Sequence, residues 1–326
     1  MLPFIRVADI QLGPLPIHSF GLLVATGVIL GTSITLRRAR ARGLDVDSLN
    51  SFITWALVSG FIFAHWLNDL FYEPELIKKD PLRLLRFWES ISSFGGFVGG
   101  VLGAFLWKYF EAVPFIRTPF GTIPKFRRRA HAAPILPWCD MVMGVFPVAW
   151  IFGRSGCSIA HDHIGAVAPA GSPIAVAAPY EDFRMLMAPY KGPPTIKFEW
   201  GPYPRYDLGL LELIFTIVIC VFLVASWSRK LPTGTYCAFA ALTYAPVRWV
   251  MDGFRLEAND VRYAGFTPAQ WQCIGLFGAG LWVAYVAWQN SKKDIDPMDL
   301  WRRQPKPVAD GVAVAPEAAA TTTTSS

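Results

Sequence analysis

The sequence predicts an all-α integral membrane protein with about seven transmembrane helices, for three reasons. Of the 326 residues, 53% are hydrophobic and only 17% are charged, whereas soluble domains average about 45–50% apolar and about 25% charged residues. The apolar residues form long blocks, near the length of about 20 residues that a helix needs to cross a bilayer. The Lys and Arg residues gather in alternate segments between those blocks. These observations exclude a soluble enzyme and a disordered chain.

Seven apolar stretches, taken in chain order, are candidates to cross a bilayer. They lie near residues 17–36, 49–71, 91–110, 138–153, 208–228, 234–251 and 269–289. The first is followed by arginines rather than by a cleavage site, so we expect a retained helix and not a signal peptide. The third carries five glycines between residues 95 and 103, which should let it pack closely on another helix. The fourth is short because Arg154 marks its predicted end.

The distribution of Lys and Arg predicts the orientation. The segments after the first, third, fifth and seventh stretches hold 17 of the 30 Lys and Arg residues. Because cytoplasmic segments carry such an excess, the N-terminus is predicted outside and the C-terminus in the cytoplasm. Residues 154–206 then form an extracytoplasmic loop element, with a long outer loop at 165–205. The cations are topology signals and contacts to anionic lipid, so we expect no nucleic-acid partner.

The chain divides into a membrane domain, residues 1–290, and a cytoplasmic tail, residues 291–326. The tail is basic at first and then low in complexity, which predicts disorder. The five cysteines are odd in number, widely spaced and without a CxxC pair. We therefore expect neither a disulfide framework nor a zinc site.

Arg248 interrupts the sixth stretch, where a charge costs about 2.5–3.5 kcal/mol to insert and needs a partner or a cavity. Asp252 and Arg255 follow four and seven residues later, so the three side chains share one helix face. One interpretation is an Arg248–Asp252 ion pair that only holds the bundle together. The other is an anion site, in which two arginines bind a phosphate and Asp252 orients one of them.

A second polar cluster follows the fourth stretch and consists of Arg154, Gly156 and the run His161-Asp162-His163. An arginine at the membrane surface beside this run could bind an anionic head group, and a histidine could supply a base. The alternative is a polar turn that caps the end of a helix. The run matches no standard spacing of metal ligands, so we expect no metal site.

In order and spacing, these motifs resemble the bacterial prolipoprotein diacylglyceryl transferase family from about residue 14 to 290. The matching segments are His18-Ser19-Phe20-Gly21, residues 80–88, Ser93-Phe94-Gly95-Gly96, Asp140 with Pro147, Gly153-Arg154-Ser155-Gly156, Pro204-Arg205, Glu212, and Arg248 with Asp252 and Arg255. Seven spans with the N-terminus outside is also the topology of that family.

The resemblance implies a multi-pass enzyme of lipoprotein biosynthesis in the bacterial inner membrane, with its active site on the extracytoplasmic side. It would transfer a diacylglyceryl group from phosphatidylglycerol to the lipobox cysteine thiol of a prolipoprotein signal peptide, releasing glycerol phosphate. Its partners would be that phospholipid, those signal peptides and the membrane, and no cofactor is expected. The resemblance assigns the phospholipid head group to Arg154, Gly156, Arg248, Asp252 and Arg255.

Several family positions carry other residues here. The family motif Ser-Phe-His-Gly-Gly, whose histidine is thought to be the base, reads Ser93-Phe94-Gly95-Gly96 and lacks that histidine. Phe20, His65, Cys157, Asp162, Asp207 and Gly209 replace the usual Tyr, Arg, Asn, Glu, Ser and Gln. We therefore expect catalysis to rely on His161, Asp162 and His163 for the proton, together with Arg248.

Two alternatives stay open. A divergent relative could bind phospholipid and then use another acceptor, or transfer nothing. The other alternative is a small-solute transporter. The sequence argues against it, because it shows neither an internal repeat nor a pair of broken helices.

Overall fold

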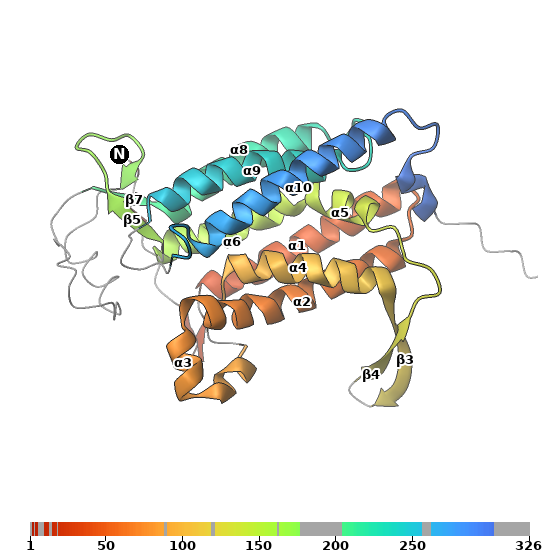
Figure 1. Ribbon diagram of the computed structural model, residues 1–326, viewed down its shortest axis with the longest axis horizontal. Coiled ribbons are helices and arrows are strands. Elements are labelled where there is room, and N and C mark those ends of the chain that lie inside the picture. The colour runs from red at the N-terminus through yellow and green to blue at the C-terminus, as the bar shows by residue number, and fades with distance from the viewer. Residues whose placement is uncertain are drawn as a thin grey trace, which may run out of the picture.

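The computed structural model describes residues 2, 4–5, 10–12, 15–17, 19–87, 90–118, 121–161, 163–176, 204–255 and 262–302. Its centre is a bundle of long helices that run alongside one another (Figure 1). The long helices are α1 Ser19–Ala41, α2 Val46–Tyr72, α4 Ser93–Tyr109, α6 Phe146–Ala160, α8 Leu208–Ala225, α9 Thr235–Gly253 and α10 Pro268–Asn290. Each of the seven apolar stretches of the sequence is therefore helical.

Four of the described helices, α1, α2, α8 and α10, are long and apolar enough to cross a membrane. A fifth candidate is the pair formed by α5, Leu136–Met143, and α6, which is bent by 52°. Helix α4 has only 17 residues, and α9 carries charged residues among its apolar ones. The chain is thus a mostly helical membrane protein with four to five clear candidate spans among the described residues.

The bend between α5 and α6 corrects the predicted fourth stretch. Gly144 and Val145 separate the two helices, and a proline stands in the first turn of each of them. The second helix continues to Ala160 instead of ending at residue 153. Arg154 therefore lies inside α6, where it is almost fully buried. The sequence predicted that the helix ends at this residue, because an arginine is costly inside a membrane helix. A buried partner of opposite charge reduces that cost.

Helix α4 approaches α2 closely along a glycine face, as its composition predicted. A Cβ atom placed on Gly95, Gly99 or Gly103 would lie 2.2–2.5 Å from backbone carbonyl oxygens of α2. These glycines are four residues apart and therefore share one helix face. No side chain fits between the two backbones at these positions, so the glycines set the distance between α2 and α4.

Small sheets supplement the helices, so the fold is not purely α-helical. Strands β1 Ile10–Leu12 and β2 Leu15–Ile17 form one antiparallel hairpin, and β3 Phe110–Thr118 and β4 Gly121–Arg128 form another. Strands β5 Ile164–Val167, β7 Arg205–Asp207 and β6 Ala175–Val176 form a three-stranded sheet in that order. These strands are short and were not predicted, because the long apolar stretches of the helices were the main pattern in the sequence.

The four basic segments meet at one end of the bundle, which we call the basic end (Figure 1). The Arg38 guanidinium lies 4.1 Å from the Trp227 ring, which joins the end of α1 to the segment after α8. The short helix η2, Pro297–Trp301, packs Trp301 against Trp107 and Trp138 with tilted rings, so residues 291–302 fold back onto the bundle. The three-stranded sheet β5–β7–β6 lies at the opposite end, which we call the sheet end.

Candidate functional site

Two arginines and a glutamate from three helices meet near the sheet end. Arg154 on α6 places Nε 3.0 Å from Oε1 of Glu212 on α8. Arg248 on α9 places Nη1 2.7 Å from the other oxygen, Oε2. The three residues are 1–5% exposed. One carboxylate therefore holds two guanidinium groups that the sequence separates by more than ninety residues.

Neutral side chains complete the surroundings of Glu212. The Tyr244 hydroxyl donates a 2.7 Å hydrogen bond to Oε1, and the Trp150 indole donates a longer one of 3.4 Å. The Arg154 guanidinium also lies over the Trp150 ring, 4.6 Å from its centroid. Removing one partner from a buried ion pair typically costs about 3–5 kcal/mol, because the other charge stays behind uncompensated. The cluster is therefore held in place from several sides.

The last turn of α9 extends the cluster toward α10. Asp252 Oδ1 lies 3.4 Å from Arg248 Nη2 and 2.6 Å from Arg255 Nε. Its Oδ2 accepts a hydrogen bond from Thr267, the residue that caps the N-terminus of α10. The Arg248–Asp252 ion pair that helical spacing suggested is thus present, together with a second pair from Asp252 to Arg255. Asp252 therefore connects Arg248 on α9 to Arg255, which lies just beyond the end of that helix at Gly253.

These five charged side chains carry three positive and two negative charges. The arginine cluster, which we define as Arg154, Glu212, Arg248, Asp252 and Arg255, therefore has one positive charge in excess. Each guanidinium has five N–H donors, and the contacts of Arg154 and Arg248 to carboxylates use only some of them. A phosphodiester could accept planar, two-point hydrogen bonds from these arginines.

Gly156 lies beside the cluster but faces α1. A Cβ atom on Gly156 would lie 2.7 Å from Cδ2 of Phe20, so the glycine makes room for that ring. The Sγ atom of Cys157, the next residue, lies 3.8 Å from Nη1 of Arg154. A Cβ atom on Gly209 of α8 would meet the Cys157 backbone at 3.0 Å. Small residues thus bring α1, α6 and α8 together around Arg154.

His161 and His163 lie on opposite sides of Asp162, which is outside the described residues. His161 ends α6 in a left-handed conformation and is buried. Its Nδ1 lies 2.6 Å from Asp207 Oδ2, and its Nε2 lies 2.9 Å from the Ile5 carbonyl oxygen. Both ring nitrogens therefore face hydrogen-bond acceptors.

His163 differs from His161 in its surroundings. Its side chain is half-buried, and it interacts electrostatically with Glu212. Its carbonyl oxygen accepts a 3.0 Å hydrogen bond from the Leu208 amide at the start of α8. Of the two histidines, His163 is therefore the one whose side chain combines partial exposure with a link to the arginine cluster.

Sequence reasoning gave no role to three residues that shape the site. Glu212 was matched only as part of the resemblance, Tyr244 was not singled out, and Asp207 was noted only as a departure. A glutamate five residues into the very apolar helix α8 was the available signal, because such a charge needs a partner. Nothing in the sequence indicated that Asp207 would pair with His161.

Arg205 in β7 is a further buried cation of the sheet end. Burial lowers the pKa of its guanidinium. It donates a 3.2 Å hydrogen bond to the Gly165 carbonyl oxygen, which ties β7 to β5. Asp207, at the end of the same strand, accepts from the Leu210 amide and so caps α8. The strand thus positions the helix that carries Glu212.

A separate buried polar network lies at the far end of α2 from the basic end. His65 places its ring nitrogens 2.8 Å from the Ser90 carbonyl oxygen and 2.9 Å from the Arg83 carbonyl oxygen. Arg83 donates to Asp69 at 2.8 Å and to Glu73 at 2.5 Å. The network fastens the arm formed by α3 Pro74–Lys79 and η1 Pro81–Leu85 to α2. We assign it a structural role.

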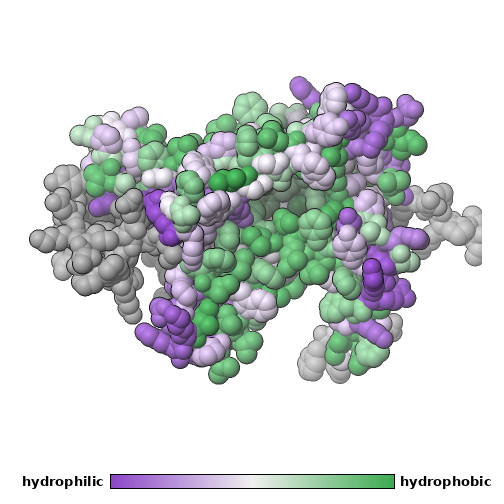
Figure 2. All heavy atoms as spheres, in the orientation of Figure 1, coloured by the Kyte–Doolittle hydropathy of each residue, from purple (hydrophilic) through white to green (hydrophobic). Residues whose placement is uncertain are grey.

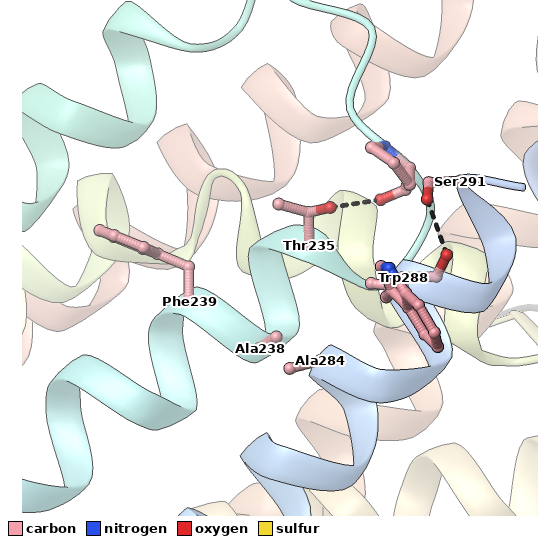
Figure 3. A pocket seen from close by; sticks show the side chains of 8 residues that line it. Thr235, Ala238, Phe239, Ala284, Trp288 and Ser291 are labelled. Carbon is pink, nitrogen blue, oxygen red and sulfur yellow. Dashed lines mark hydrogen bonds between the residues drawn. The ribbon is translucent and has the colours of Figure 1, made fainter.

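An apolar groove of about 360 Å³ lies between α9 and α10 at the basic end (Figure 3). Ala238, Phe239, Ala284 and Trp288 line it, and the hydroxyls of nearby Thr235 and Ser291 donate to backbone carbonyls. The groove is therefore separate from the arginine cluster. In the part of the chain that the structure describes, no group of three or more His, Cys, Asp or Glu residues is arranged to hold a metal ion.

The chain matches known proteins along most of its length. The family model for prolipoprotein diacylglyceryl transferase matches residues 7–286. A phosphatidylglycerol–prolipoprotein diacylglyceryl transferase of Agrobacterium fabrum is 25% identical over 310 residues, covering 90% of this chain and 96% of the relative. The transferase of the same name from Neisseria meningitidis serogroup C is 27% identical, covering 87% and 96%.

A third relative of the same name, from Tolumonas auensis, is 34% identical over a shorter segment, covering 45% of this chain and 54% of the relative. The long matches to the first two relatives and the family match extend over the helices that carry Arg154, Glu212 and Arg248. The chain therefore belongs to the prolipoprotein diacylglyceryl transferase family.

Proposed function

We propose that this protein transfers a diacylglyceryl group from phosphatidylglycerol to the lipobox cysteine thiol of a prolipoprotein. The observation that carries the proposal is the buried contact of Arg154 and Arg248 with Glu212, in a chain matched by this family along residues 7–286. The relatives bear the name of this activity. The step belongs to lipoprotein biosynthesis in a membrane.

The reaction has two physical requirements. The thiol, with an ordinary pKa of about 8.5, must lose its proton before the sulfur attacks carbon. As the new S–C bond forms, the C–O bond between the diacylglyceryl carbon and the phosphate oxygen breaks. Glycerol phosphate leaves with that electron pair, so its oxygens gain negative charge. The site therefore needs a base for the proton and fixed positive charge for the phosphate.

Arg154 and Arg248 meet the second requirement in this proposal. Glu212 holds both guanidinium groups at fixed positions, and their remaining N–H donors would bind the phosphate oxygens. Asp252 orients Arg248 and Arg255, the third arginine, which would assist at the head group. Gly156 contributes by letting α6 approach α1 beside Arg154. The acyl chains would lie in the bilayer between the helices.

His163 is the base that we propose, because its side chain is half-buried and its carbonyl oxygen is bonded to the start of α8, the helix that carries Glu212. Histidine, with an unperturbed pKa of about 6.5, is suited to take a proton near neutral pH. His161, whose two ring nitrogens both face acceptors, would instead act through Asp207. Asp162 lies between them in the sequence and would influence either ring.

We further propose seven membrane segments, with the N-terminus outside, the C-terminus in the cytoplasm and residues 1–290 as the membrane domain. The four basic segments at one end of the bundle and the arginine cluster near the other end support this orientation. The active site would then face the extracytoplasmic side of a bacterial inner membrane. Phosphatidylglycerol and lipobox signal peptides would reach it from the bilayer.

The test is mass spectrometry of a synthetic lipobox peptide incubated with phosphatidylglycerol and the purified protein. Wild type should add the mass of a diacylglyceryl group to the peptide. His163→Ala should slow this about 10²–10⁴-fold, the usual contribution of a general base. His131→Ala, at an exposed position of the basic end, is the control and should leave the rate unchanged.

The second candidate function is phospholipid binding without this transfer, and the missing family histidine favours it. Gly95 packs so tightly on α2 that no side chain fits there. An absence of peptide modification by wild type, with phosphatidylglycerol still bound, would favour this second function. Equal modification by wild type and His163→Ala would instead mean that another group takes the proton.

A further inference from the structure

The hairpin of β3 and β4 exposes large apolar side chains at the basic end. Phe115 and Phe126 are each 63% exposed, and Ile123 is 51% exposed. A two-stranded hairpin is marginally stable in water, and apolar patches of this kind mark surfaces that meet a partner. At the base of the hairpin, the Arg129 amide donates to the Tyr109 carbonyl oxygen at the end of α4.

The same hairpin is strongly basic. Residues 108–129 include six Lys or Arg residues and one acidic residue, Glu111. Glu111 lies 2.7 Å from Arg127 and 3.6 Å from Arg129. Lys125 and Arg128 are exposed and have no carboxylate partner within the described part of the chain. The Lys125 ammonium lies 5.7 Å from the Phe115 ring centroid, so cation and aromatic ring occur together.

The hairpin lies beside the bundle rather than beyond its end. The Phe126 ring contacts Trp55 at 5.3 Å between centroids. Trp55 is nine residues inside α2, which corresponds to about 13 Å from the start of that helix. The hairpin and the α3–η1 arm project to the same side from opposite ends of the bundle (Figure 1). Between them lies an apolar wall over α2 and α4 (Figure 2).

We propose that the β3–β4 hairpin docks on an anionic phospholipid surface at the basic end. Phe115, Phe126 and Ile123 enter the interfacial layer, while Lys125 and Arg128 reach lipid phosphates. A bilayer fits better than an acidic protein because the apolar face of the hairpin continues the membrane-facing wall. Aromatic rings beside cations are also typical of groups anchored at a membrane interface.

Hydrogen–deuterium exchange of the full-length protein in lipid nanodiscs tests this, with one copy in each disc to exclude pairing between copies. One set of discs contains only phosphatidylcholine, and the other contains 30% phosphatidylglycerol. Peptides covering β3 and β4 should exchange more slowly in the anionic discs. Peptides covering Pro297–Trp301, at the same end of the bundle, should exchange equally in both.

The charge variants complete the test. Each cation near an anionic surface contributes about 1 kcal/mol, or about fivefold in the ratio of docked to undocked hairpin. Lys125→Gln with Arg128→Gln should therefore remove most of the added protection. The control is the double variant Lys78→Gln with Lys79→Gln, which makes the same change of charge on the exposed side of α3. This variant should retain the added protection of β3 and β4. Equal exchange of wild type in both discs, or equal protection in both double variants, would overturn the proposal.

Discussion

At the scale of single residues, the site depends on charges that are buried together. Arg154, Glu212 and Arg248 come from three helices, and each of them would be costly in the bundle alone. Their mutual contacts make the arrangement tolerable and also fix its geometry. A bound phosphate would therefore contact guanidinium groups at fixed positions around one carboxylate, and not only a region of positive charge.

The first prediction concerns the planar shape of these guanidinium groups. Arg154→Lys or Arg248→Lys keeps the charge but loses the two-point hydrogen bonding. We expect each to slow diacylglyceryl transfer about 10²-fold, comparable to the loss of one donor at a charged transition state. Protein levels in the membrane should stay unchanged, and Arg302→Lys at the exposed basic end is the control. A loss of abundance with normal specific activity would indicate a purely structural ion pair.

The second prediction concerns the His161–Asp207 pair, which joins the end of α6 to the start of α8. Asp207→Ala removes the ion pair and the cap of α8 together, so we expect a destabilisation of about 3–5 kcal/mol. Asp207→Asn also loses the charge beside His161 but can still accept from the Leu210 amide, so it should cost about 1 kcal/mol less, the usual contribution of a cap. Thermal unfolding in detergent measures the difference. Equal unfolding temperatures for the two variants would show that the cap adds little beyond the contact with His161.

Sequence reasoning at this scale succeeded where contacts are local. Helical spacing placed Asp252 beside Arg248, and the structure shows that ion pair. Arg255 also pairs with Asp252, but it does so from beyond the helix, because α9 ends at Gly253. Sequence reasoning could not find the contact of Arg154 with Glu212, which depends on how α6 packs on α8. It also gave no indication that His161 would contact Asp207.

At the scale of elements, apolar length predicted the helices well, because a stretch of about 20 apolar residues has few alternatives in a bilayer. The stretches near 208–228 and 269–289 begin within one residue of α8 and α10. The bend at Gly144 and the strands of the sheet end escaped prediction. Those features depend on packing against other elements, and this packing cannot be inferred from the composition of a segment.

The third prediction tests the glycine face between α4 and α2. A Cβ atom in Gly99→Ala would lie 2.5 Å from the Ser59 carbonyl oxygen, and in Gly103→Ala 2.5 Å from the Trp55 carbonyl oxygen. Overpacking of this kind costs about 1–3 kcal/mol, so both variants should unfold at lower temperature. Gly100→Ala is the matched control, since its Cβ would meet nothing nearer than 4.0 Å. A lower unfolding temperature for this control as well would mean that helix propensity, rather than close approach, explains the effect.

At the scale of the whole molecule, the two ends of the bundle differ in chemistry. The basic end gathers the cations and the aromatic cluster around Trp301, Trp107 and Trp138. The arginine cluster lies near the sheet end, where β7 and the cap of α8 position Glu212. In a membrane, the positions of the cations determine the orientation of the bundle, because segments rich in Lys and Arg stay on the cytoplasmic side. The two ends should therefore face different compartments.

The last prediction follows from that difference. Reporters fused near residues 43 and 130, which follow α1 and the β3–β4 hairpin, should give cytoplasmic signals because arginines crowd both segments. A reporter near residue 180, which is outside the described residues, should give an extracytoplasmic signal because it follows α6 and the sheet end. A fluorescent protein active only in the cytoplasm, paired with a phosphatase active only outside it, measures each position twice. If the reporter at residue 180 gives a cytoplasmic signal, the arginine cluster near the sheet end would face the cytoplasm, and a site for extracytoplasmic prolipoproteins could not lie there.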